Sequence, residues 1–271
     1  GVTYMGNDIF RSSGLTSITI TRNVSQIGIA PFSACTQLTE INVDEANPYF
    51  SSLDGVLTDK NRTTIVAYPA GKGKRYIIPD GITKIGTHSF FACPITYIHT
   101  PNSVKTIELF AFASCTDLDT IILGNSVDSI EGAAFRINDR LKTIYSMNPI
   151  PPAAHPEAFS SFSPMFFIQC TLYVPVGSLQ AYKNAEVWKN FKNIVENDFT
   201  GIERPSPDKA KIFGNKNSIS FRNIEPGTDI SIYDTTGKCI KTFAVDGDSE
   251  IPLPSGIYLI KYAGRTVKII L

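Results

Sequence analysis

Apolar positions recur along this chain in a unit of 22 or 23 residues. Each copy reads L-x-x-I-x-I, then V-x-x-I-G and F-x-x-C, with mostly polar residues between these positions. A period of this size is typical of a solenoid in which every copy forms one coil. The first complete copy runs from Leu15 to Cys35, and the anchor of the first motif recurs at Ile18, Ile41, Tyr76, Ile98, Ile121 and Ile144.

The alternation within each copy predicts the structure of one coil. L-x-x-I-x-I indicates a short strand whose alternate residues point into the stack, and F-x-x-C indicates an arc that turns the chain back. One coil cannot bury its own apolar side, so neighbouring coils must stack at the ~4.8 Å spacing of paired strands. The sequence therefore predicts a shared interior column of the aromatic residues Phe32, Phe90, Phe112 and Phe135.

Three of the five cysteines, Cys35, Cys93 and Cys115, fall at one phase of the repeat, and none of the five forms a CxxC pair. Their odd number, five, suggests neither a zinc site nor a closed set of disulfides. A ladder of small, weakly polar side chains that satisfies arc backbone is the favoured interpretation, because a buried thiol is usually inert. Its members are Ser13, Cys35, Cys93, Cys115 and Asn138.

One spacing between copies is longer than the rest. Ile41 and Tyr76 are 35 residues apart, which leaves about 12 additional residues. Residues 55–69 contain two alternating segments on either side of a polar turn at 59–62, so they predict a β-hairpin insertion.

The remaining chain predicts a cap and a second domain. After Leu141 the repeat ends in a proline-rich segment, followed by a strand at 171–175 and a helix that Ser178 caps and that carries Trp188 and Phe191. We therefore expect a solenoid with a C-terminal cap over 1–197 and a linker over 198–208. Residues 209–271 hold short alternating segments that predict a small Ig-like β-sandwich. The fold class is mainly β.

The repeat, with its I-G and F-x-x-C phases, resembles the BspA-like leucine-rich repeats of bacterial surface and secreted proteins over residues 5–197. The segments 43–57 and 68–71 look like that family's hairpin insertion, and 172–191 resembles its closing element. The resemblance implies a leucine-rich-repeat solenoid that is exported or displayed on the cell surface and binds other molecules.

The C-terminal segment resembles a different kind of domain. Ile232–Lys238, Leu253–Tyr258 and the terminal Lys268–Ile270 are similar to C-terminal sorting domains of the type IX (Por) secretion systems of Bacteroidetes. That similarity implies export to the outer membrane surface, with this domain addressing the secretion machinery. A retained accessory β-domain is the alternative.

Composition and motifs exclude several function classes. The 25 basic and 25 acidic residues form no basic stripe, which argues against a nucleic-acid partner. No apolar run approaches the roughly 18 residues of a membrane span, so no membrane insertion is expected. The three histidines are scattered, and HExxH, GxSxG and P-loop motifs are absent from the sequence, so we expect neither enzymatic activity nor a cofactor. Asp246, Asp248 and Glu250 favour a solvated turn over a weak calcium site.

The predicted strands leave one candidate binding surface. The residues between the buried positions of each strand line the outer face of the sheet, and adjacent strands are expected to join them into one patch. Exposed aromatic and aliphatic side chains on a rigid support are typical anchors of protein interfaces, although such residues also cover one another across neighbouring strands. The candidate residues are Glu40, Asn42, Arg75, Ile77, Tyr97, His99, Ile122 and Tyr145.

Three functions fit these observations. The first is a non-enzymatic adhesion protein that uses this patch to bind host or extracellular matrix protein. The second is a glycan-binding module of a nutrient-uptake system. The third is a structural spacer for a region upstream of Gly1, which a chain that begins inside a coil favours.

Overall fold

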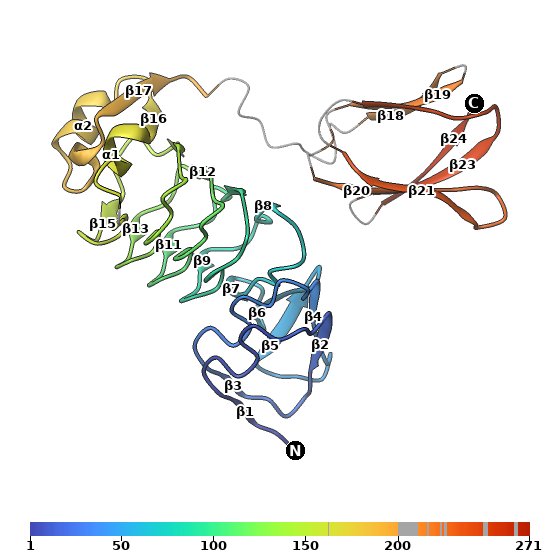
Figure 1. Ribbon diagram of the computed structural model, residues 1–271, viewed down its shortest axis with the longest axis horizontal. Coiled ribbons are helices and arrows are strands. Elements are labelled where there is room, and N and C mark those ends of the chain that lie inside the picture. Colours follow the sequence, from blue (N-terminus) through green and yellow to red (C-terminus); the bar gives the residue numbers. More distant parts are fainter. Residues whose placement is uncertain are drawn as a thin grey trace. The chain divides into compact units, whose positions relative to one another are not determined.

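The computed structural model describes residues 1–161, 163–199, 211–215, 217–222, 224, 227–245, 249–262 and 265–271. They divide into two compact units, Gly1–Asp198 and Phe199–Leu271 (Figure 1). Residues 200–208 of the predicted linker lie outside the described residues. Within the described residues, no helix is long and apolar enough to cross a membrane.

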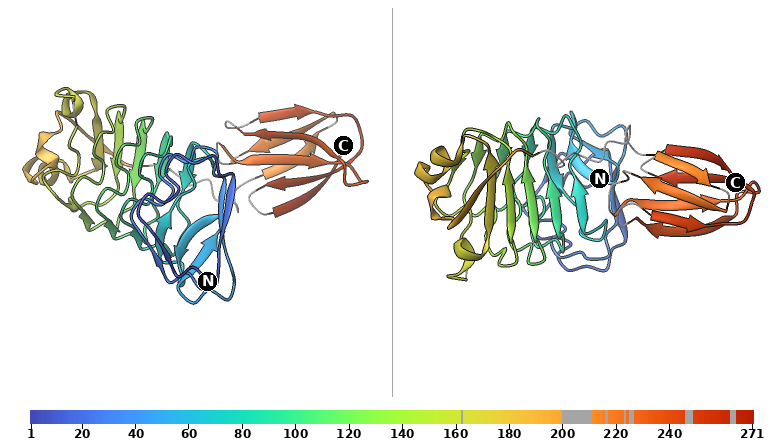
Figure 2. Two further views of the ribbon diagram at one scale, coloured as in Figure 1. Left: turned by 60° about the horizontal axis from the view of Figure 1, so that its bottom comes forward. Right: turned by 90° about the horizontal axis from the view of Figure 1, so that it is seen from above.

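The first unit is a solenoid whose coils stack through parallel strands (Figure 2). A six-stranded parallel sheet follows one side of the stack in the order β17-β16-β14-β12-β10-β8. Its strands are β8 (Arg75–Ile77), β10 (Tyr97–His99), β12 (Thr120–Leu123), β14 (Thr143–Ser146), β16 (Thr171–Pro175) and β17 (Asn193–Asn197).

Another sheet follows a second side of the coils in the order β15-β13-β11-β9-β7-β6-β5. Its two-residue parallel strands are β9 (Lys84–Ile85), β11 (Thr106–Ile107), β13 (Ser129–Ile130) and β15 (Ala153–Ala154). The N-terminal coils contribute two parallel pairs, β1 (Tyr4–Met5) with β3 (Gln26–Ile27) and β2 (Ser17–Ile20) with β4 (Glu40–Val43).

The predicted hairpin is confirmed and gains a strand. β6 (Val56–Asp59) and β7 (Thr64–Ala67) pair antiparallel around the polar turn, and β5 (Phe50–Leu53) pairs with β6 on its other side. β7 then pairs parallel with β9 and so joins the hairpin to the following coils. The hairpin thus takes the place of one coil in the stack.

The aromatic column is confirmed for three of the four predicted residues. Phe90, Phe112 and Phe135 are at most 1% exposed, and consecutive ring centroids lie 4.8 and 5.3 Å apart. Phe32 was wrongly placed in this column: it stacks on Phe10, at 5.7 Å, in a separate core cluster. The physical reason is the hairpin, because Tyr68 occupies the position next to Phe90, at 4.8 Å.

The ladder of small polar side chains is also confirmed. Cys35, Cys93, Cys115 and Asn138 each donate to the carbonyl of an aromatic residue in the preceding coil, as in Cys35 Sγ to Phe10 O at 2.8 Å and Cys115 Sγ to Phe90 O at 3.0 Å. The fifth member, Ser13, instead pairs its hydroxyl with Cys35 Sγ at 3.4 Å. At the same phase, Asn138 Nδ2 donates to Phe112 O at 2.9 Å. Phe10 O and Phe90 O also accept from the backbone at Ser13 N and Cys93 N, so the thiols are second donors to these arc carbonyls.

Thiol reactivity tests this interpretation of the cysteines. Burial raises the pKa of Cys115 and of Cys170 to about 12 and also raises the pKa of Cys93, so their reactive thiolates are scarce near neutral pH. Cys35 is buried as well, whereas Cys239 is exposed. We expect a thiol reagent at pH 8 to modify Cys239 rapidly and the other four only after denaturation, as peptide mass spectrometry can measure. Rapid modification of Cys115 in the native protein would contradict this.

The cap departs from the predicted long helix. α1 (Phe166–Gln169) precedes the last predicted strand, and after it the chain forms α2 (Leu179–Asn184), the 3₁₀ turn η1 (Trp188–Asn190) and β17. α2 ends at Asn184, and Val187 has a φ of 71°, which no continuing helix adopts. Ser178 does not cap α2 with its side chain; instead the Glu196 carboxylate accepts hydrogen bonds from Gly177 N at 2.8 Å and Leu179 N at 3.3 Å.

The described part of the second unit is a small β-sandwich, as predicted. A three-stranded antiparallel sheet (β18-β19-β22) and a four-stranded one (β21-β20-β23-β24) enclose an apolar core that includes Phe221 and Ile260, both 0% exposed. The strands are β18 (Lys211–Asn215), β19 (Ser218–Arg222), β20 (Asp229–Tyr233), β21 (Cys239–Ala244), β22 (Ser249–Pro252), β23 (Ile257–Tyr262) and β24 (Arg265–Ile270).

Candidate functional site on the six-stranded sheet

The outer positions of the six-stranded sheet form two straight rows, because its parallel strands pair without a shift in register. We call them the first row and the second row. The first row contains Arg75, Tyr97, Thr120, Thr143, Thr171 and Asn193. The second row contains Ile77, His99, Ile122, Tyr145, Tyr173 and Val195.

The middle of the second row is less accessible than the sequence suggested. Ile122 was expected to be exposed, but Ile122 and His99 are each only 4% exposed. Both lie between in-register neighbours, His99 between Ile77 and Ile122, and Ile122 between His99 and Tyr145. These side chains therefore cover one another, as cross-strand neighbours do, and Ile122 is not an exposed anchor.

Two of the predicted residues lie on a different sheet. Glu40 and Asn42 belong to β4, which pairs with β2 and not with β8. The hairpin occupies the other edge of β4: Ile41 N donates to Gly55 O at 2.7 Å, and Ser52 Oγ donates to Ile41 O at 2.7 Å. The expected single patch is therefore wrong, and its other six residues share the six-stranded sheet.

The rows extend beyond the predicted residues toward the cap. Tyr173 continues the second row, and its ring stacks on Tyr145 with centroids 4.8 Å apart and planes inclined by 18°. Partial burial, and then the neighbouring Tyr173, raise the pKa of Tyr145. The signal for this extension is present in the sequence, because Thr171-Leu172-Tyr173 repeats the pattern of the preceding strand.

The end of the second row next to the cap is its most exposed apolar part. Tyr145 and Tyr173 are half-buried, and Val195 is 44% exposed. At the opposite edge of the sheet, the Arg75 guanidinium lies 3.9 Å from the centre of the Tyr97 ring, a cation–π contact that restrains both side chains. This surface can bury apolar groups of a partner at low cost in side-chain entropy.

Other chemistry is sparse in the described part of the chain. No group of three or more His, Cys, Asp or Glu residues there is arranged to hold a metal ion. Of the candidate calcium ligands, Asp246 and Asp248 lie outside the described residues, and Glu250 accepts a hydrogen bond from Ser218 Oγ.

Comparison with solved structures finds similar solenoids. The pneumococcal vaccine antigen PcpA is 19% identical, with 72% of this chain and 60% of that chain covered and a TM-score of 0.50. A leucine-rich cell surface protein from Faecalibacterium prausnitzii is 20% identical over 72% of this chain and 52% of that one, with a TM-score of 0.43. A leucine-rich repeat protein from Eubacterium ventriosum is 19% identical over 74% and 62%, with a TM-score of 0.45.

These likenesses concern the fold, and this chain spans less than two thirds of the length of each of the three. Among curated proteins no match is found. The family model for the BspA type leucine-rich repeat region matches six copies, at residues 1–53 and 69–172, which together make up more than half of the chain. The interruption coincides with the hairpin, and the match ends in β16, before α2. The chain therefore belongs to the BspA type leucine-rich repeat family.

Proposed function

We propose that this chain is an exported or cell-surface protein that binds a host or extracellular matrix protein through the six-stranded sheet. The observation that carries the proposal is the Tyr145–Tyr173 stack beside the exposed Val195. Large aromatic groups on a rigid sheet are the residues that most often dominate protein interfaces. Membership of the BspA type leucine-rich repeat family supports an interaction scaffold.

The tyrosine pair tests the proposed interface. We expect Tyr145→Ala with Tyr173→Ala to weaken binding to matrix proteins by at least about tenfold, because interface anchors are worth ~2 kcal/mol or more each. The free energy of unfolding should fall by much less than that of a core variant, since a half-buried aromatic pair adds only about 0.5–1.5 kcal/mol beyond its buried area. Surface plasmon resonance on immobilised collagen, fibronectin, laminin and fibrinogen measures the first quantity, and thermal unfolding measures the second.

Tyr49→Ala provides the matched control, because Tyr49 is 53% exposed beside the hairpin and lies outside both rows. It should bind like the unchanged protein. Equal binding by the double variant and by Tyr49→Ala, or binding to none of the four matrix proteins, would rule out this use of the sheet.

Export is the second part of the proposal. The resemblance of residues 232–238 and 253–258 to sorting domains supports delivery through a secretion machinery that reads the C-terminal unit. We expect deletion of 199–271 in the native host to keep the solenoid inside the cell, as antibody labelling of intact and lysed cells can measure. Undiminished surface labelling after the deletion would make this unit an accessory domain.

A further inference from the structure

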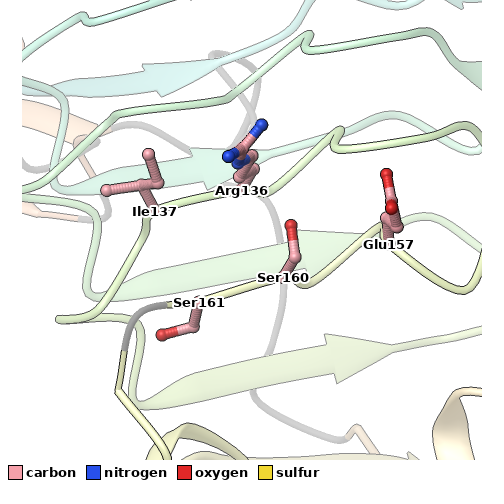
Figure 3. A pocket seen from close by; sticks show the side chains of 5 residues that line it. All are labelled: Arg136, Ile137, Glu157, Ser160 and Ser161. Atoms are coloured by element: carbon pink, nitrogen blue, oxygen red, sulfur yellow. The ribbon is translucent and has the colours of Figure 1, made fainter.

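Two adjoining hollows lie among arc residues of the solenoid, on side chains that belong to neither row. The smaller one has a volume of about 190 Å³ and is shown in Figure 3. It is lined by Arg136, Ile137, Glu157, Ser160 and Ser161. The larger one is an open groove of about 760 Å³, lined mainly by apolar residues that include Leu109, Phe110 and Ala154. Glu157 lines both, so the two hollows are neighbours that share one side chain.

The groove exists because side-chain size changes abruptly between coils. One arc carries Leu109 and Phe110, whereas the same positions of the next arc are Gly132 and Ala133, and Ala153–Ala154 follow in the next coil. The Phe110 ring is braced by His88, with centroids 4.9 Å apart, while Leu109 is 40% exposed. The result is an aromatic and aliphatic wall beside a floor of small residues.

The smaller hollow combines opposite charges with a hydroxyl. In Figure 3 the Ser160 hydroxyl and the Glu157 carboxylate point toward the side on which the Arg136 guanidinium lies, whereas Ser161 points away. Ser161 is already engaged, because its hydroxyl donates to Asp139. Within the described residues, the side-chain polar groups of Arg136, Glu157 and Ser160 have no hydrogen-bond or ion-pair partner. An incoming ligand therefore meets the guanidinium of Arg136 as a donor, the carboxylate of Glu157 as an acceptor, and the Ser160 hydroxyl, which can be either.

We propose that these hollows form a binding cleft for a neutral oligosaccharide, with one pyranose ring in the smaller hollow and the next ring against Phe110. Neighbouring ring hydroxyls both donate and accept, so one can accept from Arg136 while the other donates to Glu157. An ionic group would be attracted by only one of these side chains and repelled by the other. The apolar C–H face of a sugar fits Ile137 and the Phe110 wall.

The size of the smaller hollow agrees with this occupant. Pockets for drug-sized molecules usually measure ~300–1,000 Å³, so a hollow of about 190 Å³ suits a single ring. The larger groove is open, so a chain of sugar rings that extends past Glu157 can lie along it. This site is independent of the proposed protein-binding sheet and takes a ligand of another chemical class.

The experiment is a titration of the full chain with neutral tetra- to hexasaccharides of β-1,4-glucan, α-1,4-glucan, mannan and galactan, followed by NMR. Binding should shift the Arg136 side-chain Nε–H signal and the amide signals of Glu157 and Ser160 for at least one sugar. Arg136→Met keeps the length of the side chain but removes its donors, and we expect it to weaken that binding about tenfold or more.

Two controls separate this proposal from the alternatives. Arg140→Met removes a nearby arginine that pairs with Asp117 at 3.0 Å outside both hollows, and it should bind like the unchanged protein. Tyr145→Ala with Tyr173→Ala should also keep sugar binding, so the failure of one site is distinguishable from the failure of the other. No shift with any of the four sugars at millimolar concentration, or equal binding by Arg136→Met, would overturn the proposal.

Discussion

Replacing Trp188 by alanine is expected to lower the free energy of unfolding of the solenoid by about 3–5 kcal/mol, the range for large aromatic residues in a core. The Trp188 side chain is 0% exposed and contacts Phe159 and Tyr182, each with ring centroids 5.5 Å away. Its Nε1–H donates to Pro152 O at 2.7 Å. Alanine leaves both a cavity and an unsatisfied carbonyl where the cap closes the stack.

Denaturant unfolding followed by far-ultraviolet circular dichroism measures this loss without using tryptophan fluorescence. Lys189→Ala is the matched control, because Lys189 is the next residue of the same 3₁₀ turn and is exposed. The control should change the unfolding free energy by less than about 0.5 kcal/mol. A Trp188→Ala variant as stable as Lys189→Ala would show that the solenoid does not need this closure.

The second large effect is expected at Asn47, which lies at the entrance to the hairpin. This side chain is 0% exposed and makes four hydrogen bonds to backbone, from its Nδ2 to Thr21 O and Val24 O at 2.9 Å each, and to its Oδ1 from Tyr49 N and Phe50 N at 2.8 Å each. Leucine has the same number of side-chain heavy atoms and the same branching but satisfies none of these groups. Because a buried unsatisfied group costs about 1–3 kcal/mol, Asn47→Leu should destabilise by at least ~4 kcal/mol.

Asn61→Leu is the control for this substitution, since Asn61 is exposed in the turn between β6 and β7. Hydrogen exchange should in addition show faster exchange of the Tyr49 and Phe50 amides in Asn47→Leu. Normal protection of these two amides would contradict the role assigned to Asn47, whatever the change in overall stability.

The solenoid was predictable because its period is set by one physical requirement, the burial of the same side of every coil. Residues at equal phase, such as Phe90 and Phe112, must meet when coils stack, and they do. The exception at Phe32 shows the limit of this reasoning. Counting residues detects an insertion but cannot say that Tyr68, from within it, enters the aromatic column.

The arcs and the cap were less predictable. Each arc turns by placing two residues in the left-handed region, as at Ala30 and Ala34 with φ of 48° and 55°, and again at His88 and Ala92. None of these is glycine, so local propensity gives no signal, and contacts between coils impose the conformation. In the cap, helical spacing from Leu179 to Ile194 suggested a single helix, but burying Trp188 and pairing β17 with β16 requires three short elements.

The candidate site could be predicted only in part for a similar reason. Alternation correctly assigns Tyr97 and Tyr145 to the outer side of the strands, because the side-chain period of a strand is two. Whether an outer residue is accessible depends on its in-register neighbours, and for His99 and Ile122 these neighbours cover it. The arc hollows depend on differences in side-chain size between equivalent positions of the coils. A search for repeats relies on what these positions share, so it does not detect such differences.

The direction of the strands also determines how the solenoid responds to a pulling force. In-register partners of the six-stranded sheet are 22 or 23 residues apart, as between Arg75 and Tyr97 and between Tyr97 and Thr120, except for the 28 residues between Thr143 and Thr171. A load along the stacking direction opens the bonds of one coil before those of the next, and each freed coil adds about 75 Å of extended chain. A solenoid of this kind under tension lengthens in steps and dissipates mechanical work at each step.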